Sequence, residues 1–484
     1  MKIMMRARAV LAAAFLFAGL STATGQITGS GIPPAFGNTP PPETVPFGTL
    51  SFDRFSGSGV VDKLVPGVIQ LSVIEAIDRG LKHNLGLILS QEEKSFERAQ
   101  RLRELSILLP QVSFTGSESV QQINLAAFGI PFNGLTVVGP FGLFDARPHL
   151  SDRLLDLSAV NRLRSAIQNE KAASLTVQDA RELVVLVVGN EYLLTLSADA
   201  RLDTARAQLT TAQAIYQQAQ DMKKAGVVPG IDVLRAQVQM QERQQAVLSA
   251  ENQLAKQRMN LARTIGLPLT QGFELTDKVP YSPMAELNLE EELARTYSRR
   301  PEYLAAEARL HAAERQVVAA RQERLPTLDV FGDFGVFGPA PGSAQPTFSV
   351  AAGLRVPVFD GGRIKSDVIQ AQANVSQLKS QLEDLRGRIE LEVRSAILDV
   401  TTSNDQVAVA QQSIVLAADQ LKQSQDRFRS GVSTSLEVVQ AQEAVATANE
   451  TLIQATYLNN VAKLSLARAL GVAEQRTRAF FGGK

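Results

Sequence analysis

Two heptad patterns that lie 205 residues apart constrain the fold of this chain more than any other feature of its sequence. Apolar and small residues recur at steps of three and four from Leu202 to Ala219, and again from Val407 to Phe428. A period of about 3.5 residues is typical of helices that pack as left-handed coiled coils, whereas a globular helix with a period of about 3.6 drifts out of that register. We therefore expect two long helices with coiled-coil packing.

The correspondence between the two regions continues beyond the heptads, which indicates an internal repeat. Both copies end on the pattern Leu-Ala-Arg-x-x-Gly, at 261–266 and at 466–471. Nearer the N-terminus, Leu109-Pro110 matches Leu325-Pro326 at an offset of 216, so the difference between the two offsets gives the first copy 11 extra residues. We place these extra residues in the Gly- and Phe-rich stretch 128–144, as a longer hairpin loop.

The N-terminus has the layout of a secretory signal peptide, because basic residues precede an apolar run and small residues follow it. We assign 1–25 to this signal peptide. Residues 26–70 are rich in proline and glycine and show no helical or strand period, so we interpret them as an extended periplasmic leader. We expect the first structural repeat over 71–281, the second over 282–472 and a C-terminal tail over 473–484.

Each repeat is expected to contain a helix, two strands, a long helix, a sharp turn and a further helix. In the second repeat, residues 348–358 alternate between apolar and polar or small residues, which predicts a strand with one apolar face, and 327–337 is its expected partner. The equivalent strands of the first repeat, 111–124 and 150–157, show a weak pattern and are predicted from the repeat. The helices expected in the first repeat are 84–108, 158–221 and 230–266.

The strands are too few to close a membrane barrel within one chain, because the smallest such barrels have about eight strands. An open sheet would leave unpaired backbone groups in lipid, so we expect several copies to share one barrel. The long helix, 158–221, would extend roughly 96 Å, and the two shorter helices placed end to end would match its length. The chain has no cysteine and no later apolar run of the roughly 20 residues that a transmembrane helix needs, so strands must provide any membrane attachment.

Several short motifs, taken in their order, resemble the outer-membrane efflux protein family of the TolC type. They are Leu-Pro before a strand, Val-Phe-Asp-Gly-Gly-Arg at 358–363, the helical tip pattern from Gly431 to Gln442, and the Leu-Ala-Arg-x-x-Gly endings. The resemblance covers about residues 71–472. It implies an α+β membrane protein, whose long coiled-coil helices form a periplasmic α-barrel and whose four strands contribute to a trimeric twelve-stranded outer-membrane β-barrel.

The same resemblance implies a trimeric outer-membrane channel of a tripartite efflux or type I secretion system, gated at its periplasmic helix tips. The implied partners are two further copies of the chain, a periplasmic adaptor protein, an inner-membrane transporter of the proton-driven or ATP-binding cassette type, and outer-membrane lipid. The transporter chooses the substrate, so the genes that neighbour this one would separate efflux from secretion.

By this resemblance, the tip of the second repeat carries the residues that narrow the periplasmic entrance of the channel. The family often has two carboxylates there, one helical turn apart, whereas this chain has Glu437 and Gln440, so one acidic ring is kept and the other is lost. Asp232 occupies the equivalent position in the first repeat. A ring of three Glu437 carboxylates would favour cations, as charged rings in channels do.

The resemblance also implies that the two turns at the helix tips, 223–229 and 429–433, contact the adaptor. Glycine suits the left-handed position that follows the end of a helix, and each turn carries one. The residues expected to contact the adaptor are Gly226, Val227, Gly431, Val432 and Ser433.

Charge and residue content argue against several other classes of protein. The 49 basic residues equal the 49 acidic residues, which gives no electrostatic case for a nucleic-acid partner. His83, His149 and His311 lack partners at metal-ligand spacing, and we see no nucleophile or catalytic dyad, so we predict no metal, no cofactor and no enzymatic activity. The alternative to a channel is a soluble periplasmic coiled-coil scaffold or adaptor, which would have no use for four strands at one end of both repeats.

Overall fold

The computed structural model describes residues 54–59, 62–129, 136–277 and 289–475 of the chain. These residues all belong to one of the two units into which the chain divides, Leu50–Lys484. The predicted signal peptide, most of the predicted leader and residues 476–484 of the predicted tail lie outside the described residues.

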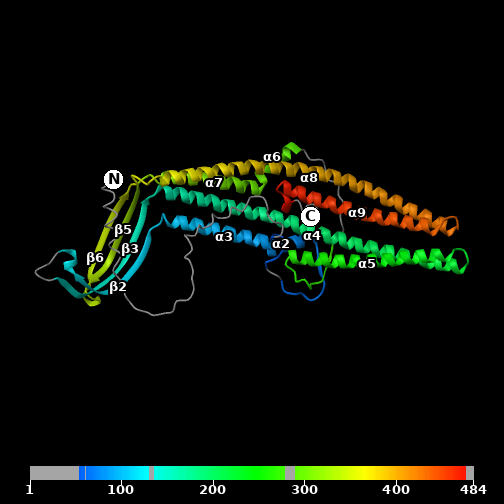
Figure 1. Ribbon diagram of the computed structural model, residues 1–484, viewed down its shortest axis with the longest axis horizontal. Coiled ribbons are helices and arrows are strands. Elements are labelled where there is room, and N and C mark those ends of the chain that lie inside the picture. Colours follow the sequence, from blue (N-terminus) through cyan, green and yellow to red (C-terminus); the bar gives the residue numbers. More distant parts are fainter. Residues whose placement is uncertain (1–53, 60–61, 130–135, 278–288, 476–484) are drawn as a thin grey trace, which may run out of the picture. The chain divides into compact units, whose positions relative to one another are not determined.

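The helices and strands follow the same order in both copies of the repeat (Figure 1). The first copy contains α2 (Val73–His83), α3 (Leu85–Ser106), β2 (Gln111–Asn124), β3 (Val137–Leu155), α4 (Leu157–Lys224) and α5 (Gly230–Thr264). The second copy contains α6 (Leu289–Arg299), α7 (Pro301–Gln322), β5 (Thr327–Gly338), β6 (Gln345–Arg355), α8 (Arg363–Arg429) and α9 (Ser435–Ala469). The starts of α2 and α6 lie 216 residues apart and those of α5 and α9 lie 205 apart, so both offsets seen in the sequence recur in the structure.

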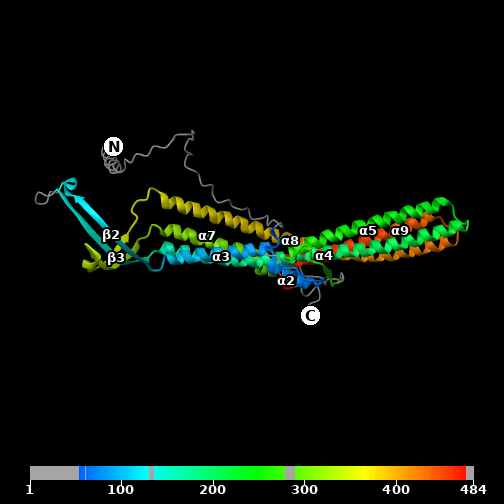
Figure 2. The same cartoon turned by 90° about the horizontal axis from the view of Figure 1, so that it is seen from below.

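One long helix in each copy runs beside two shorter helices that follow each other along it (Figures 1 and 2). Helix α4 has 68 residues, which corresponds to roughly 102 Å, and α8 has 67. Helices α3 and α5, with 22 and 35 residues, lie along α4. The predicted pairing of one long helix with two stacked short ones is therefore confirmed, and α2 and α6 are additional short helices that the sequence patterns did not predict.

The residues of the predicted heptads form the contacts between these helices. Leu202, Ala205 and Ala219 are buried on α4, and Val407 and Phe428 are buried on α8. Helix α4 also contains, among the described helices, the one stretch that is long and apolar enough to cross a membrane by composition, but 67% of that stretch is buried inside the chain. This burial is what a core helix of a coiled coil requires, so the heptad prediction is confirmed.

The four long strands form one antiparallel sheet in the order β2-β3-β5-β6. Strands β3 and β5 pair with each other, so the sheet joins the two copies of the repeat. Strand β3 is much longer than the predicted 150–157, and residues 137–144 belong to it rather than to a loop. The glycines at 139 and 142 weaken the strand pattern in the sequence, but pairing with β2 fixes this part of the strand.

The end of the predicted leader packs against the helices and is not an extended linker. Phe55 is 3% exposed and belongs to the same apolar cluster as Ile77 and Tyr192. Strand β1 (Ile69–Leu71) begins within the leader and pairs in parallel with β4 (Phe273–Leu275). This part of the leader prediction was wrong, because the ladder partner of so short a strand lies about 200 residues away and leaves no local pattern.

Candidate functional site

The four-stranded sheet has one apolar face and one polar face. The side chains of successive strand residues point to opposite faces, so the pairing register decides which residues share a face. One face carries Val112, Phe114, Val120, Leu150, Leu154, Leu328, Val330, Phe334, Phe348, Val350, Ala352 and Leu354. The opposite face carries Ser113, Thr115, Ser117, Asp145, Arg147, His149, Arg153, Asp329, Asp333 and Ser349. Such a sheet suits a position between lipid and a watery lumen.

Ion pairs between neighbouring strands cover the polar face. Arg147 lies 2.7 Å from Asp333 of β5 and also pairs with Asp145 on its own strand. Arg153 lies 3.2 Å from Asp329, and the hydroxyl of Ser349 donates a hydrogen bond to Asp333. These contacts join β3, β5 and β6, so they tie the two repeats together across the polar face.

The apolar face is exposed in the single chain, although its residues are large and aliphatic or aromatic. Val112, Phe114, Val350 and Phe348 are each more than 70% exposed. No described helix covers this face, and exposed apolar area of this kind marks a surface that faces a partner or a membrane. The sheet also keeps two unpaired edges, β2 and β6.

An aspartate caps each long helix at the point where the chain leaves the sheet. Asp156 accepts a hydrogen bond from the Ala159 amide at 2.8 Å, at the N-terminus of α4. Asp360 accepts hydrogen bonds from the amides of Gly362 and Ile364, at 3.0 and 2.8 Å, at the N-terminus of α8. Aspartate is a favoured N-cap because its carboxylate satisfies amides that have no helical partner. These hydrogen bonds lower the pKa of the Asp360 carboxyl below its usual value.

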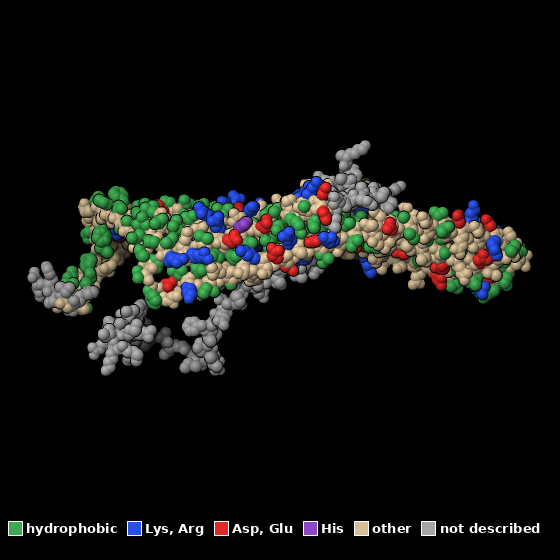
Figure 3. All heavy atoms as spheres, turned by 90° about the horizontal axis from the view of Figure 1, so that it is seen from above, with side chains coloured by type: hydrophobic (Ala, Val, Ile, Leu, Met, Phe, Trp, Pro, Cys, Tyr) green, Lys and Arg blue, Asp and Glu red, His purple; other side chains and the backbone are tan. Residues whose placement is uncertain are grey.

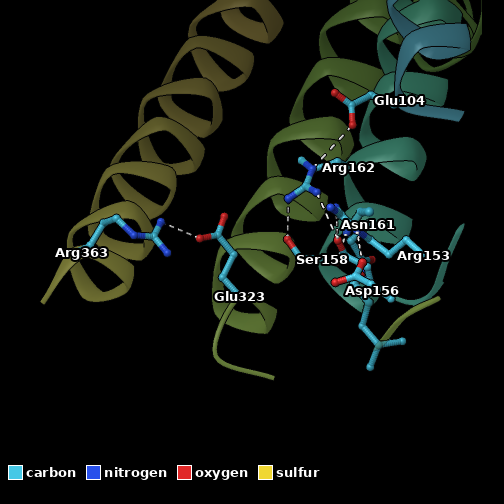
Figure 4. Close-up of polar contacts among 11 residues, drawn as sticks. Glu104, Arg153, Asp156, Ser158, Asn161, Arg162, Glu323 and Arg363 are labelled. Carbon is cyan, nitrogen blue, oxygen red and sulfur yellow. Dashed lines mark hydrogen bonds and ion pairs between the residues drawn. The ribbon is translucent and has the colours of Figure 1, made fainter. Parts of the chain in front are cut away.

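Arginines connect these capped ends to the neighbouring helices (Figure 4). Arg162 donates to the Ser158 hydroxyl at 2.8 Å and lies 3.6 Å from Glu104 of α3. Arg363 of α8 lies 2.8 Å from Glu323, which follows α7. The sequence reasoning missed this network, although an aspartate directly before each long helix was a detectable N-cap signal.

The two turns at the helix tips have the same backbone geometry. Gly226 and Gly431 have φ angles of 70° and 71°, in the left-handed region that favours glycine. The amide of Val227 donates to the Met222 carbonyl at 2.9 Å, and the amide of Val432 donates to the Arg427 carbonyl at 3.0 Å. Together with the glycine amide bonds to Lys223 and Phe428, these contacts are Schellman motifs. The turns therefore present Val227 and Val432, which are 61% and 71% exposed, at the ends of the two helix pairs.

Glu437 lies in the first turn of α9, as predicted, and has two partners within the chain. The Ser433 hydroxyl donates a hydrogen bond to its carboxylate, and Arg427 Nε lies 3.5 Å from it. The Glu437 side chain is 41% exposed, and Gln440, one turn further along, is exposed. The carboxylate is therefore accessible, but a cation partly neutralises it.

Asp232 does not lie beside Glu437, although the two positions are equivalent in the repeats. It is 8% exposed and accepts a hydrogen bond from the Ser435 hydroxyl at 2.6 Å. Eleven residues further along the chain, Arg243 pairs with Glu443, which also accepts a hydrogen bond from Gln239 at 2.7 Å. These contacts hold α5 against α9, so Asp232 joins the two tips within one chain.

A cluster of buried charges lies far from both ends, where α7 begins and α9 ends. Arg300 is 1% exposed and lies 2.6 Å from Glu392 and 2.8 Å from Glu302. Its guanidinium also donates to the Ala469 carbonyl at 3.3 Å. Burial acts to lower the pKa of Arg300, but the two carboxylates raise it above its ordinary value.

Asp179 and Arg468 extend this cluster toward α4. They form an ion pair at 2.7 Å, and both side chains are about nine-tenths buried. Burial raises the pKa of the Asp179 carboxyl, while the Arg468 guanidinium acts in the opposite direction. Sequence reasoning missed the cluster, although Pro301 marks the start of a helix and so places Arg300 at its N-cap.

Comparison with known proteins adds an independent finding. A model of the outer membrane efflux protein family matches residues 93–267 and 293–472. The pyoverdine export outer membrane protein OpmQ of Pseudomonas aeruginosa is 25% identical over 324 residues, which cover 65% of this chain and 67% of that protein. The outer membrane protein TolC of Escherichia coli is 24% identical over 413 residues, 80% of this chain and 79% of that protein.

Solved structures show the same fold. The Campylobacter jejuni CmeC outer membrane channel superposes with a TM-score of 0.72 at 17% identity, over 89% of this chain and 95% of that one. The outer-membrane channel OprN superposes with a TM-score of 0.70 at 20% identity, over 82% of this chain and 89% of that one.

Proposed function

This chain belongs to the outer membrane efflux protein family, and from that premise we propose that three copies join their four-stranded sheets into one twelve-stranded barrel. Members of this family are outer-membrane efflux channels with a large periplasmic helical part, and the chain is a subunit of such a channel rather than a soluble scaffold. The amphipathic sheet with its two unpaired edges carries the proposal. Three sheets joined edge to edge would pair every strand and turn the apolar faces toward lipid.

The ion pairs of the polar face would then line the lumen of the barrel. Arg147 lies next to Asp145 and Asp333, and Arg153 lies next to Asp329, so carboxylates outnumber the arginines they contact. Below the barrel, the long helices of three copies would form the periplasmic tunnel, with the tip turns at its far end.

The mass of the assembly in detergent tests the shared barrel. We expect the protein in the outer-membrane fraction, with a detergent-corrected mass of roughly 150 kDa by light scattering, three times the chain of 52.3 kDa less its signal peptide. A monomer or dimer in the periplasmic fraction would reject the proposal, because four strands with free edges cannot form a closed barrel.

The periplasmic constriction is proposed to lie at Glu437 and Gln440. Both side chains are accessible near the tip of α9, whereas Asp232 is buried against Ser435. Asp232 is therefore assigned the role of holding the tip of α5 against α9 beside the constriction. Only one of the two ring positions carries a charge, so the ring of three Glu437 carboxylates sets the electrostatic preference.

Replacing Glu437 by glutamine should lower the cation preference of single channels in planar bilayers. A carboxylate about 4 Å from the path of an ion in water contributes about 1 kcal/mol, which corresponds to roughly fivefold in permeability ratio. Arg427→Gln is the matched variant with the opposite sign, because it removes the cation 3.5 Å from the same carboxylate and should raise the cation preference. If neither variant changes conductance or selectivity, the constriction lies elsewhere.

The two tip turns are proposed to contact a periplasmic adaptor, which would connect the channel to an inner-membrane transporter of the proton-driven or ATP-binding cassette type. Gly226 and Gly431 fix the turns, and Val227, Val432 and Ser433 present side chains beyond the helix ends. The two turns share one backbone geometry, so an adaptor could use the same contacts at both.

A further inference from the structure

The connection between β6 and α8 exposes two large apolar side chains to a degree that the rest of the chain does not explain. Val358 is 92% exposed and Phe359 is 91% exposed, although they lie between a paired strand and a capped helix. Both flank Asp360, which caps α8, so the chain around them is held by defined hydrogen bonds. An exposed phenylalanine in a fixed position indicates contact with an apolar partner.

The alternation of β6 continues through this connection. Phe348, Val350 and Leu354 point to the apolar face of the sheet. The last ladder pair involves Arg355, but Val356 and Val358 continue the same period of two beyond it. The apolar face therefore extends past the last hydrogen-bonded residue of the strand, toward the helices.

The height of the apolar band requires this extension. Strands of outer-membrane barrels rise about 3.3 Å per residue and tilt by about 40°, so the six steps from Phe348 to Leu354 cover a height of only about 15 Å. The apolar band of such barrels is about 25 Å tall. Ten steps, from Phe348 to Val358, reach at most about 25 Å, so the band is complete only if the connection belongs to it.

The other three connections between the sheet and the helices carry exposed apolar residues at the same level. These are Leu109 before β2, Leu154 at the end of β3 and Leu325 before β5, with exposed fractions of 49%, 60% and 37%. The apolar border is thus shared by all four strands and is not a property of one loop.

Cations without carboxylate partners lie next to this border. Arg321 and Arg324 lie at the end of α7, and Lys365 lies in the first turn of α8, which the Arg363–Glu323 ion pair brings close to α7. All three residues are exposed, and none of them pairs with a carboxylate in the described part of the chain. Figure 3 shows Lys and Arg side chains beside the apolar end of the face it draws. Phosphate groups of a phospholipid leaflet would complement these charges.

We propose that the connection 356–359 inserts into the periplasmic leaflet of the outer membrane, at the boundary between acyl chains and headgroups, and that Arg321, Arg324 and Lys365 contact the lipid phosphates. This inference rests on the proposed barrel and adds the position of its lower membrane border. The competing occupant is a second copy of the chain, whose connection before β2 would lie beside β6 in a closed barrel.

Tryptophan fluorescence tests the proposal cleanly, because the chain contains no tryptophan. Phe359→Trp and Val358→Trp should each lose most of their emission in trimers reconstituted into vesicles of phosphatidylcholine brominated near the headgroup. Leu354→Trp, which lies higher on the apolar face, should be quenched more strongly by lipid brominated deep in the acyl chains. Phe331→Trp, on the polar face, should be quenched by neither lipid and serves as the lumen control.

The outcomes separate this inference from the barrel itself. Quenching at Leu354 but not at 358 or 359, with blue-shifted emission, would assign the connection to contact with a second copy. Red-shifted emission that aqueous iodide quenches would assign it to water, and either result overturns the inference while keeping the barrel. Absence of lipid quenching at Leu354 as well would overturn the barrel.

Discussion

Arg300→Met is expected to lower the free energy of unfolding by about 3–5 kcal/mol, because it leaves two carboxylates buried without their cation. Arg300 is 1% exposed and contacts Glu392 at 2.6 Å and Glu302 at 2.8 Å. It also satisfies the Ala469 carbonyl, in the last turn of α9. One side chain therefore joins the start of α7, the middle of α8 and the end of α9.

The matched control is Arg295→Met on α6. Arg295 lies 3.6–3.8 Å from two glutamates, but its side chain is 55% exposed, so its ion pairs should contribute less than about 1 kcal/mol. The measurement is the guanidinium midpoint of helix unfolding in detergent, converted with the slope of the transition. Equal midpoints for the two variants would show that the buried cluster is not a stabilising centre.

The sequence predicted the features that depend on local periodicity. The heptads of α4 and α8, the alternation of β6 and the 205-residue offset each repeat a simple pattern many times, so a single unfavourable residue does not hide them. The glycine turns at 226 and 431 were also predictable, because a left-handed position after a helix favours glycine strongly.

The features that the sequence did not predict depend on residues that are distant in the chain. Asp179 and Arg468 are 289 residues apart, and Arg147 and Asp333 are 186 apart. Each residue alone resembles a solvated surface charge. Only the packing of α4 against α9, or the pairing of β3 with β5, brings the partners together, so no spacing in the sequence marks them.

The candidate site shows the same division. The equivalence of Asp232 and Glu437 is correct as a repeat, but burial separates the two residues, because Asp232 accepts a hydrogen bond from Ser435 of the opposite copy. The internal repeat predicts positions, whereas the contact between the copies decides how each side chain is used. The two tips therefore differ chemically despite sharing one backbone geometry.

The face of the sheet that meets lipid can be identified by placing one arginine on each face. Ala352 and Ala351 are neighbours on β6 that point to opposite faces, and both are exposed in the single chain. Ala352→Arg should destabilise the inserted protein by about 2–4 kcal/mol, because Ala352 lies near the middle of the apolar band, where an outward arginine meets acyl chains. Ala351→Arg should change the same free energy by less than about 1 kcal/mol, because its guanidinium would lie in the watery lumen.

Folding from urea into phospholipid vesicles measures both free energies under one condition, and the same backbone, residue type and strand serve for both variants. Ala351→Arg has a second expected effect, because an added cation on the polar face should lower the cation preference of the open channel. Ala352→Arg should leave the selectivity of the molecules that do insert unchanged. Equal destabilisation by the two arginines would contradict the assignment of the faces, and a larger effect at Ala351 would reverse it and place the ion pairs of Arg147 and Arg153 against lipid.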